Sequence, residues 1–131
     1  MKQSFKPENY NSLSPYLIVD GANRFMELLR QVFNAQEKRK YLRKDGSIMH
    51  AEMSIDDSIV MIADSTQDYK ANKCMLHLYV PDSTATYQRA IEAGCQAIGA
   101  PVNKEGDPDK RGAFHDFAGN YWSVSTQIVD N

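Results

Sequence analysis

The chain has 131 residues, of which 42% are hydrophobic and only two are cysteine, so it can bury a core without disulfide bonds or a structural metal. Its formal net charge is −2 with acidic and basic residues interspersed, which argues against a nucleic-acid partner. No apolar run approaches the length of a membrane span and no signal-peptide segment follows the N-terminus, so we expect a cytoplasmic protein with no membrane partner.

The first half of the sequence predicts a strand, a helix and three further strands. Residues 1–12 are polar, and we expect them to form a flexible arm. Residues 13–20 are expected to form a strand. Residues 21–33 are expected to form an amphipathic helix, because their apolar side chains recur at spacings of three and four. Residues 35–64 are expected to contain three strands.

The second half repeats this order. Residues 74–80 predict a strand, residues 83–93 a helix, and residues 96–126 further strands. Within the last stretch, residues 101–110 are charged, contain glycine and proline, and lack apolar periodicity. We expect a loop there, either a lid over a cleft or an ordinary surface connection.

Helix-capping signals support both helices. Asp20 is placed to cap the start of the first helix, and Asn34 can end it in a left-handed conformation. Asp82 or Ser83 is placed to cap the second helix, and Gly94 is placed to stop it. Each helix therefore has expected limits as well as an apolar face.

The strands alternate between apolar and mixed faces. In residues 48–55 the expected apolar face consists of Met49, Ala51, Met53 and Ile55, and the mixed face of His50, Glu52 and Ser54. Because the apolar faces should pack against the helices, the mixed faces should line the other side of the sheets. Two sheets that curve toward each other would enclose a cleft with these mixed faces.

The pattern as a whole predicts an α+β fold made of tandem βαβββ modules, with curved mixed sheets and helices on their outer faces. We place the modules at about residues 13–66 and 73–127, within a single domain of residues 13–131. Single helices on one side leave sheet edges that a second copy can cover, so we also expect a homodimer.

Five short segments resemble the PhnB-like branch of the vicinal oxygen chelate superfamily, which includes glyoxalase I, bleomycin-resistance proteins and extradiol dioxygenases. The segments are Pro15–Val19, Ile48–Glu52, Ile59–Asp64, His77–Val80 and Asp116–Trp122. The resemblance covers residues 14–126 and implies the same paired βαβββ fold. It also implies a homodimer whose curved sheets build small-molecule clefts.

The metal chemistry of that superfamily does not follow from the resemblance. Its metal-dependent members place a histidine, glutamate or glutamine on the first, fourth, fifth and eighth strands. The matching positions here are Ser14, Met61, Met75 and Ser123. Hydroxyl and thioether groups are poor ligands for Zn²⁺, Ni²⁺ or Fe²⁺, so we expect no metal and no cofactor at these positions.

Three residues on the predicted mixed faces are candidate catalytic residues: His50, Glu52 and His77. Two histidines and one carboxylate could form an iron site with open positions. Without metal, His50 with Glu52, or His77 with Tyr79, could act as an acid–base pair. The alternative is that these residues hydrogen-bond one another or water in the cleft.

The same faces carry candidate ligand-binding residues, which are Tyr16, Met61, Met75, Tyr79, Tyr121 and Ser123. Tyrosine rings can stack on a planar ligand or hydrogen-bond to it, although they are also ordinary packing residues. We therefore predict a glyoxalase/bleomycin-resistance-like protein that binds a small organic ligand in a metal-free cleft. The alternative is a lyase-, isomerase- or oxygenase-type enzyme that uses the three candidate catalytic residues, with or without a divalent metal.

Overall fold

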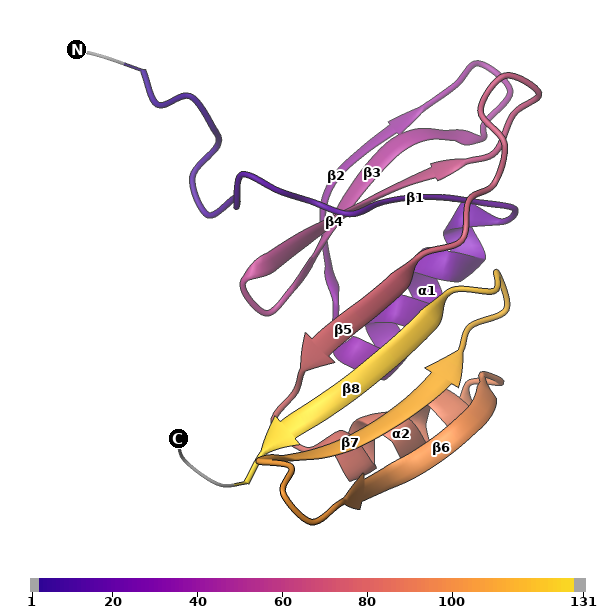
Figure 1. Cartoon of the computed structure of the whole chain (residues 1–131). Helices are drawn as coiled ribbons and strands as arrows, with labels where there is room; N and C mark the ends of the chain where they lie inside the picture. Colours follow the sequence, from indigo (N-terminus) through magenta and orange to yellow (C-terminus); the bar gives the residue numbers. More distant parts are fainter. Residues whose placement is uncertain (1–2, 129–131) are drawn as a thin grey trace. The chain divides into compact units, whose positions relative to one another are not determined.

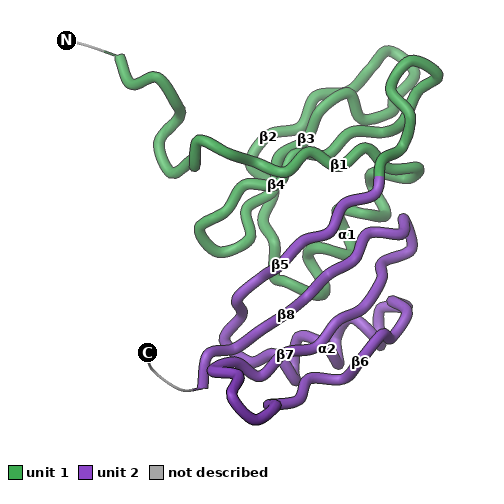
Figure 2. The backbone as a smooth tube through the Cα atoms, in the orientation of Figure 1, with its two compact units in different colours: residues 1–72 green, residues 73–131 purple. Residues whose placement is uncertain are grey.

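A computed structural model describes residues 3–128 of the chain. The described residues form the order βαβββ twice, with two helices and eight strands (Figure 1). They divide into two compact units, residues 1–72 and residues 73–131 (Figure 2). Each unit contains one of the two modules predicted from the sequence. Their union into one domain of residues 13–131 stays a prediction. Residues 1 and 2 of the predicted arm and residues 129–131 of the predicted domain lie outside the described part.

The first unit is a four-stranded mixed sheet with one helix. Its elements are β1 (Tyr16–Val19), α1 (Ala22–Phe33), β2 (Gln36–Leu42), β3 (Ile48–Ile55) and β4 (Ser58–Asp64). The strand order is β1-β4-β3-β2, in which β1 runs parallel to β4 and the other neighbours are antiparallel.

The second unit repeats this plan. Its elements are β5 (Met75–Tyr79), α2 (Ser83–Glu92), β6 (Gln96–Asn103), β7 (Asp109–His115) and β8 (Tyr121–Gln127). The strand order is β5-β8-β7-β6, with β5 parallel to β8. The α+β fold of tandem βαβββ modules that the sequence predicts is confirmed.

Each helix packs on one face of its own sheet, α1 on β1, β3 and β4 and α2 on β6, β7 and β8. The largest fully buried side chains of the first unit include Leu17 and Ile62 from the sheet and Phe25 from the helix. In the second unit, the largest fully buried side chains include Phe114 and Trp122, both from the sheet. Because the apolar positions of the strands face the helices, the opposite face of each sheet is left for polar and aromatic side chains.

One predicted helix cap is wrong. Asn34 ends α1 in the left-handed conformation, and the Asp82 carboxylate accepts a hydrogen bond from Ala85 N at 3.1 Å, as expected. Asp20, however, does not cap α1. Gly21 occupies the cap position with a φ of 93°, and the Asp64 carboxylate at the end of β4 accepts a hydrogen bond from Ala22 N at 2.8 Å.

A β-bulge in β3 corrects the predicted face of Met49. Tyr41 pairs with His50 and Leu42 pairs with Ile48, so Met49 is an extra residue without a partner on β2. The bulge lets Ile48 enter the core and leaves Met49 half exposed on the open face. Simple alternation had placed Met49 against the helix.

The segment expected to be a loop, residues 101–110, is a loop only in its middle, and its two ends belong to strands. β6 extends to Asn103 and β7 starts at Asp109, which leaves residues 104–108 as the connection. The Asn103 side chain donates to the carbonyls of Asp107 and Asp109 at 2.9 and 3.0 Å, and Asp107 N donates to the Lys104 carbonyl at 3.0 Å. The connection is therefore a hydrogen-bonded hairpin loop.

Candidate functional site

A row of hydrogen-bonded side chains crosses the open face of the first sheet. His50 and Glu52 lie two residues apart on β3, and His50 Nε2 is 2.8 Å from Glu52 Oε2. The Tyr16 hydroxyl on β1 lies 2.8 Å from His50 Nδ1. Met61 on β4 pairs with Tyr16 on one side and with Glu52 on the other. The structure thus brings together two candidate catalytic residues and two candidate ligand-binding residues.

The charge on Glu52 determines which atoms of this row donate hydrogen bonds and which accept them. Burial raises the pKa of Glu52, but hydrogen bonds from His50 and Tyr10 and the nearby Arg39 charge outweigh burial and hold it below its usual value. As a carboxylate, Glu52 can only accept, so His50 Nε2 carries a proton. In a neutral His50 ring, Nδ1 then accepts from the Tyr16 hydroxyl. A histidine oriented in this way by a carboxylate is suited to acid–base chemistry.

Two further residues complete the row, and sequence reasoning missed both. The Tyr10 hydroxyl donates to Glu52 Oε1, and Arg39 Nε lies 3.7 Å from the same oxygen. The Arg39 guanidinium lies 5.4 Å from the centre of the Tyr10 ring. Part of the arm expected to be flexible is therefore attached to the sheet. The pairing of β2 with β3 places Arg39 opposite Glu52, and this register is the one signal that could have indicated Arg39 as a neighbour of Glu52.

The remaining catalytic candidate, His77, belongs to the second unit. It pairs with Ser123 across β5 and β8, and its Nδ1 lies 3.1 Å from the Ser123 hydroxyl. Its ring makes an edge contact with Tyr79 at a centroid distance of 5.1 Å. A joint role for His77 with His50 and Glu52 stays a prediction.

The candidate ligand-binding residues of the second unit share the open face of its sheet. Met75 on β5 pairs with Tyr121 on β8, and Met75 is 78% exposed. The Tyr79 hydroxyl donates to Asp109 Oδ2 at 2.8 Å, and Arg111 lies 3.3 Å from the same carboxylate oxygen. The hydrogen bond to Asp109 raises the pKa of Tyr79, so this phenol stays protonated and anchored.

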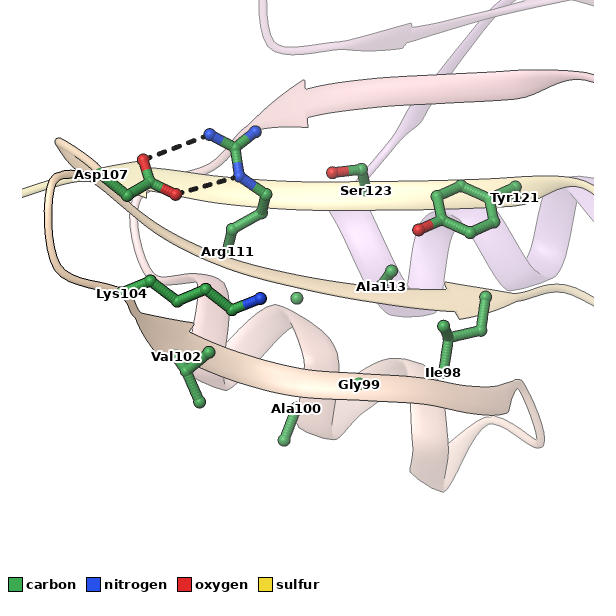
Figure 3. A pocket seen from close by; sticks show the side chains of 11 residues that line it. Ile98, Gly99, Ala100, Val102, Lys104, Asp107, Arg111, Ala113, Tyr121 and Ser123 are labelled. Carbon is green, nitrogen blue, oxygen red and sulfur yellow. Dashed lines mark hydrogen bonds and ion pairs between the residues drawn. The ribbon is translucent and has the colours of Figure 1, made fainter.

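A pocket of about 300 Å³ lies on this face, over β6, β7 and β8 (Figure 3). Tyr121 and Ser123 contribute hydroxyl groups to its lining. Its apolar walls come from Ile98, Ala100, Val102 and Ala113, and the Lys104 side chain extends along it from the hairpin loop. Met75, His77 and Tyr79 lie outside this lining. The lining also includes the charged residues Lys104, Asp107 and Arg111, so the pocket combines apolar surface with polar and charged groups that could orient a small molecule.

The four positions that the resemblance matches to metal ligands are occupied by Ser14, Met61, Met75 and Ser123. Met61 lies on β4, Met75 on β5 and Ser123 on β8, while Ser14 precedes β1 by two residues. Thioether and hydroxyl groups do not match the imidazole and carboxylate donors that divalent transition metals prefer. Among residues 3–128, no three histidine, cysteine, aspartate or glutamate side chains are grouped so that they could hold a metal ion. Neither described helix is long and apolar enough to cross a membrane.

The chain consists of two βαβββ units, with β1 beside β4 and β5 beside β8, and it has the fold of glyoxalase/bleomycin-resistance proteins. Its structure is similar to TioX from Micromonospora sp. ML1, with a TM-score of 0.76 and 18% identity, covering 90% of this chain and 99% of TioX. It is also similar to the fosfomycin resistance protein FosX from Mesorhizobium loti, with a TM-score of 0.64 and 18% identity, covering 90% and 92% of the two chains. TnmS3, an antibiotic binding protein from Streptomyces sp. CB03234, gives a TM-score of 0.68 at 13% identity, covering 96% and 99%.

The sequence itself is similar to mycobacterial proteins. It is 29% identical over 128 residues to the uncharacterized protein Mb0911c of Mycobacterium bovis, covering 89% of this chain and 84% of the relative. The identity to the uncharacterized protein Rv0887c of Mycobacterium tuberculosis is also 29% over 128 residues, covering 89% and 75%. No protein-family profile matches the chain. The predicted resemblance is confirmed at the level of the fold, and the PhnB-like branch stays a prediction.

Proposed function

We propose that this protein belongs to the PhnB-like branch of the superfamily and binds a small organic ligand on the open face of its second sheet, without a divalent metal. The observation that carries the proposal is the pocket in which Tyr121 and Ser123 present hydroxyl groups among apolar walls. Both residues were predicted to bind ligand from the sequence alone. The absence of imidazole and carboxylate groups at the four metal positions supports the metal-free part.

The pocket lining defines the kind of ligand. Ile98, Val102 and Ala113 would contact a compact apolar body, and the two hydroxyl groups would hydrogen-bond to a polar edge. Arg111 is already engaged by Asp107 and Asp109 and is not free to bind an anion. Two of the structural neighbours, TnmS3 and FosX, are an antibiotic binding protein and a fosfomycin resistance protein. These neighbours support a small organic ligand for a protein of this fold.

A small-molecule screen by thermal shift tests the proposal, because a ligand that binds the folded state raises the unfolding temperature by mass action. Ala113→Leu fills the pocket and should abolish the shift caused by a ligand found in the screen. Ala97→Leu adds the same volume on β6 outside the lining and should leave the shift intact. An equal shift in the wild type and Ala113→Leu would contradict the site. Stoichiometric iron, zinc or nickel in the purified protein would contradict the metal-free part.

A second candidate function is an acid–base enzyme of the lyase, isomerase or oxygenase type. The 2.8 Å contact between His50 and the negatively charged Glu52 specifically favours it. Mass spectrometry of a discovered ligand after incubation with the protein would detect conversion. His50→Gln should stop that conversion while ligand binding persists, and His77→Ala tests whether His77 takes part. If the ligand is recovered unchanged from the wild type, this second function is contradicted.

A further inference from the structure

A second pocket lies on the open face of the first sheet and encloses about 680 Å³. Tyr16 and Ile18 from β1, Met49 from the β3 bulge and Ala63 from β4 form its floor. Arg43 enters from the turn between β2 and β3, and the loop after β4 supplies Thr66, Asp68 and Tyr69. This pocket and the pocket of the second unit share no lining residue.

Arg43 is held in place by neutral groups. Its guanidinium donates to the Ser47 hydroxyl at 3.1 Å and to the Asp64 carbonyl at 3.3 Å. Its backbone N–H donates to the Ser47 carbonyl at 2.8 Å, which fixes the turn. No ion pair of the described residues includes Arg43. Asp45 acts on Arg43 electrostatically without a direct ion pair, so the guanidinium can bind a carboxylate ligand through its remaining N–H groups.

Two tyrosine rings form aromatic walls; a side-chain hydrogen bond anchors the Tyr16 ring, and backbone hydrogen bonds fix the main chain at Tyr69. The Tyr16 ring is anchored by its hydroxyl on His50, which Glu52 holds in turn. Tyr69 is positioned by a reciprocal pair of bonds with Thr66, in which Thr66 N donates to the Tyr69 carbonyl at 2.8 Å and Tyr69 N donates to the Thr66 hydroxyl at 2.9 Å. The Tyr16 ring, which is fixed before binding, loses little entropy when a planar ligand packs against it.

Acidic groups around the pocket limit how strongly an anion can bind. Asp68 lies in the lining on the exposed loop. Asp45 lies in the same turn as Arg43 and accepts from the Ser47 hydroxyl and backbone N–H at 2.7 and 2.9 Å. The Ser47 hydroxyl is the main group that lowers the pKa of Asp45, so this carboxylate is satisfied within the turn. Asp45 keeps its negative charge and also interacts electrostatically with Arg43, so Asp45 and Asp68 both oppose an anion in the pocket.

We propose that this first-unit pocket is a second binding site, and that it takes a small aromatic carboxylate. The carboxylate pairs with the Arg43 guanidinium, and the aromatic ring packs between Tyr16 and Tyr69 over Ile18, Met49 and Ala63. The row of Tyr16, His50 and Glu52 has a positioning role in this site, because it immobilises one of the two aromatic walls. The site does not depend on the pocket of the second unit, so either can fail without the other.

Titrations of the wild-type protein with phenylacetate and with its neutral amide, phenylacetamide, test the proposal directly. Two-dimensional amide NMR spectra should show shifts at Ile18, Met49 and Ala63 with phenylacetate. Phenylacetate should bind at least about fivefold more tightly than the amide, since only the acid pairs with the guanidinium. Equal binding of the two compounds, or shifts confined to residues of the second unit, would overturn the proposal. Because no variant is needed, this comparison does not depend on how a mutant folds.

Matched variants then identify the groups. Arg43→Gln should remove the preference for the acid, whereas Lys44→Gln removes the same charge from the adjacent exposed residue and should change binding less than about twofold. Asp68→Asn should strengthen phenylacetate binding and leave phenylacetamide unchanged. Tyr16→Phe keeps the ring and removes its anchor on His50, so it should weaken both compounds alike. If Arg43→Gln retains the preference, or Asp68→Asn weakens the acid, the assignment of the carboxylate to Arg43 is wrong.

Discussion

Glu52 is a buried carboxylate that remains charged because three side chains stabilise it. It is 4% exposed, and its oxygens face His50, Tyr10 and Arg39. The folded-state pKa of Glu52 lies below its usual value of 4.5. A lowered carboxyl pKa gives stability that is present above the unfolded-state pKa and is lost as the pH falls through the folded-state value.

Replacing this carboxylate should therefore have a pH-dependent effect. Glu52→Gln should lower the free energy of unfolding by about 1–3 kcal/mol near neutral pH, because charged hydrogen bonds are lost in a buried place. The difference between variant and wild type should shrink as the pH falls below 4.5, the usual pKa, and through the lowered folded-state pKa of Glu52. Urea denaturation at several pH values measures both effects.

Tyr10→Phe serves as the matched control for this prediction. It removes a single hydrogen bond from Glu52 Oε1 and should cost about 1 kcal/mol, less than the loss of the carboxylate. A stability difference for Glu52→Gln that is constant over the whole acidic range would show that the Glu52 charge makes no contribution to folding.

At the scale of elements, the start of α1 depends on a residue distant in the sequence. The Asp64 carboxylate accepts from Ala22 N at 2.8 Å and from Ile48 N at 2.7 Å, so it joins β4 to both α1 and β3. Asp64→Ala should lower the free energy of unfolding by about 2 kcal/mol, because two backbone donors lose their acceptor. Asp20→Ala, at the position expected from sequence to cap the helix, should cost less than about 1 kcal/mol. Urea denaturation distinguishes the two, and equal losses would contradict the assigned cap.

The contact between β6 and β7 gives a second prediction. A Cβ atom at Gly112 would lie 2.7 Å from Pro101 Cγ and 2.8 Å from Pro101 N, which is too close for either atom. Gly112→Ala should therefore destabilise the fold by about 2 kcal/mol or more, since the neighbouring backbone cannot move freely. Gly99→Ala is the control, because nothing lies within 4 Å of its added Cβ. Thermal unfolding of both variants measures the difference, and a neutral Gly112→Ala would show that β6 can shift.

Element types were predictable from the sequence because periodicity reports which side of each element is buried. The strand β3 was placed correctly at residues 48–55, but the bulge at Met49 was not foreseen. A bulge depends on the register with β2, which a single strand does not encode. Asp64 was missed as the cap of α1 for the same reason, because its partner is 42 residues away in the sequence.

The candidate site likewise contains residues whose placement follows from the sequence pattern and residues whose placement depends on the folded chain. The contact of His50 with Glu52 was predictable, since residues two apart on a strand share a face. Arg43 and Tyr69 were not, because one lies in a hairpin turn and the other in a loop, where no periodicity indicates orientation. Only the folded chain places them in one pocket with Tyr16.

At the scale of the molecule, the sheet edges differ in how well they are protected against self-association. β2 and β6 are edge strands of the two sheets, and nearly all their residues are exposed (Figure 1). β2 carries Lys38, Arg39 and Lys40, and such charges discourage strand pairing between chains. The eight residues of β6 include none with a charge.

We therefore expect the predicted homodimer to form through β6. Its exposed apolar residues, Ile98 at 46% and Val102 at 50%, would be covered, and unpaired backbone groups at the edge would gain partners. Light scattering after size exclusion should show a dimer that dissociates on dilution. Ile98→Lys should shift the equilibrium to the monomer, because it adds a charge to each copy at the contact. Tyr41→Lys makes the same type of change at an equally exposed position of β2 and should leave the dimer intact. A chain that is monomeric at all concentrations would contradict the dimer, and dissociation by Tyr41→Lys alone would place the contact on the charged edge instead.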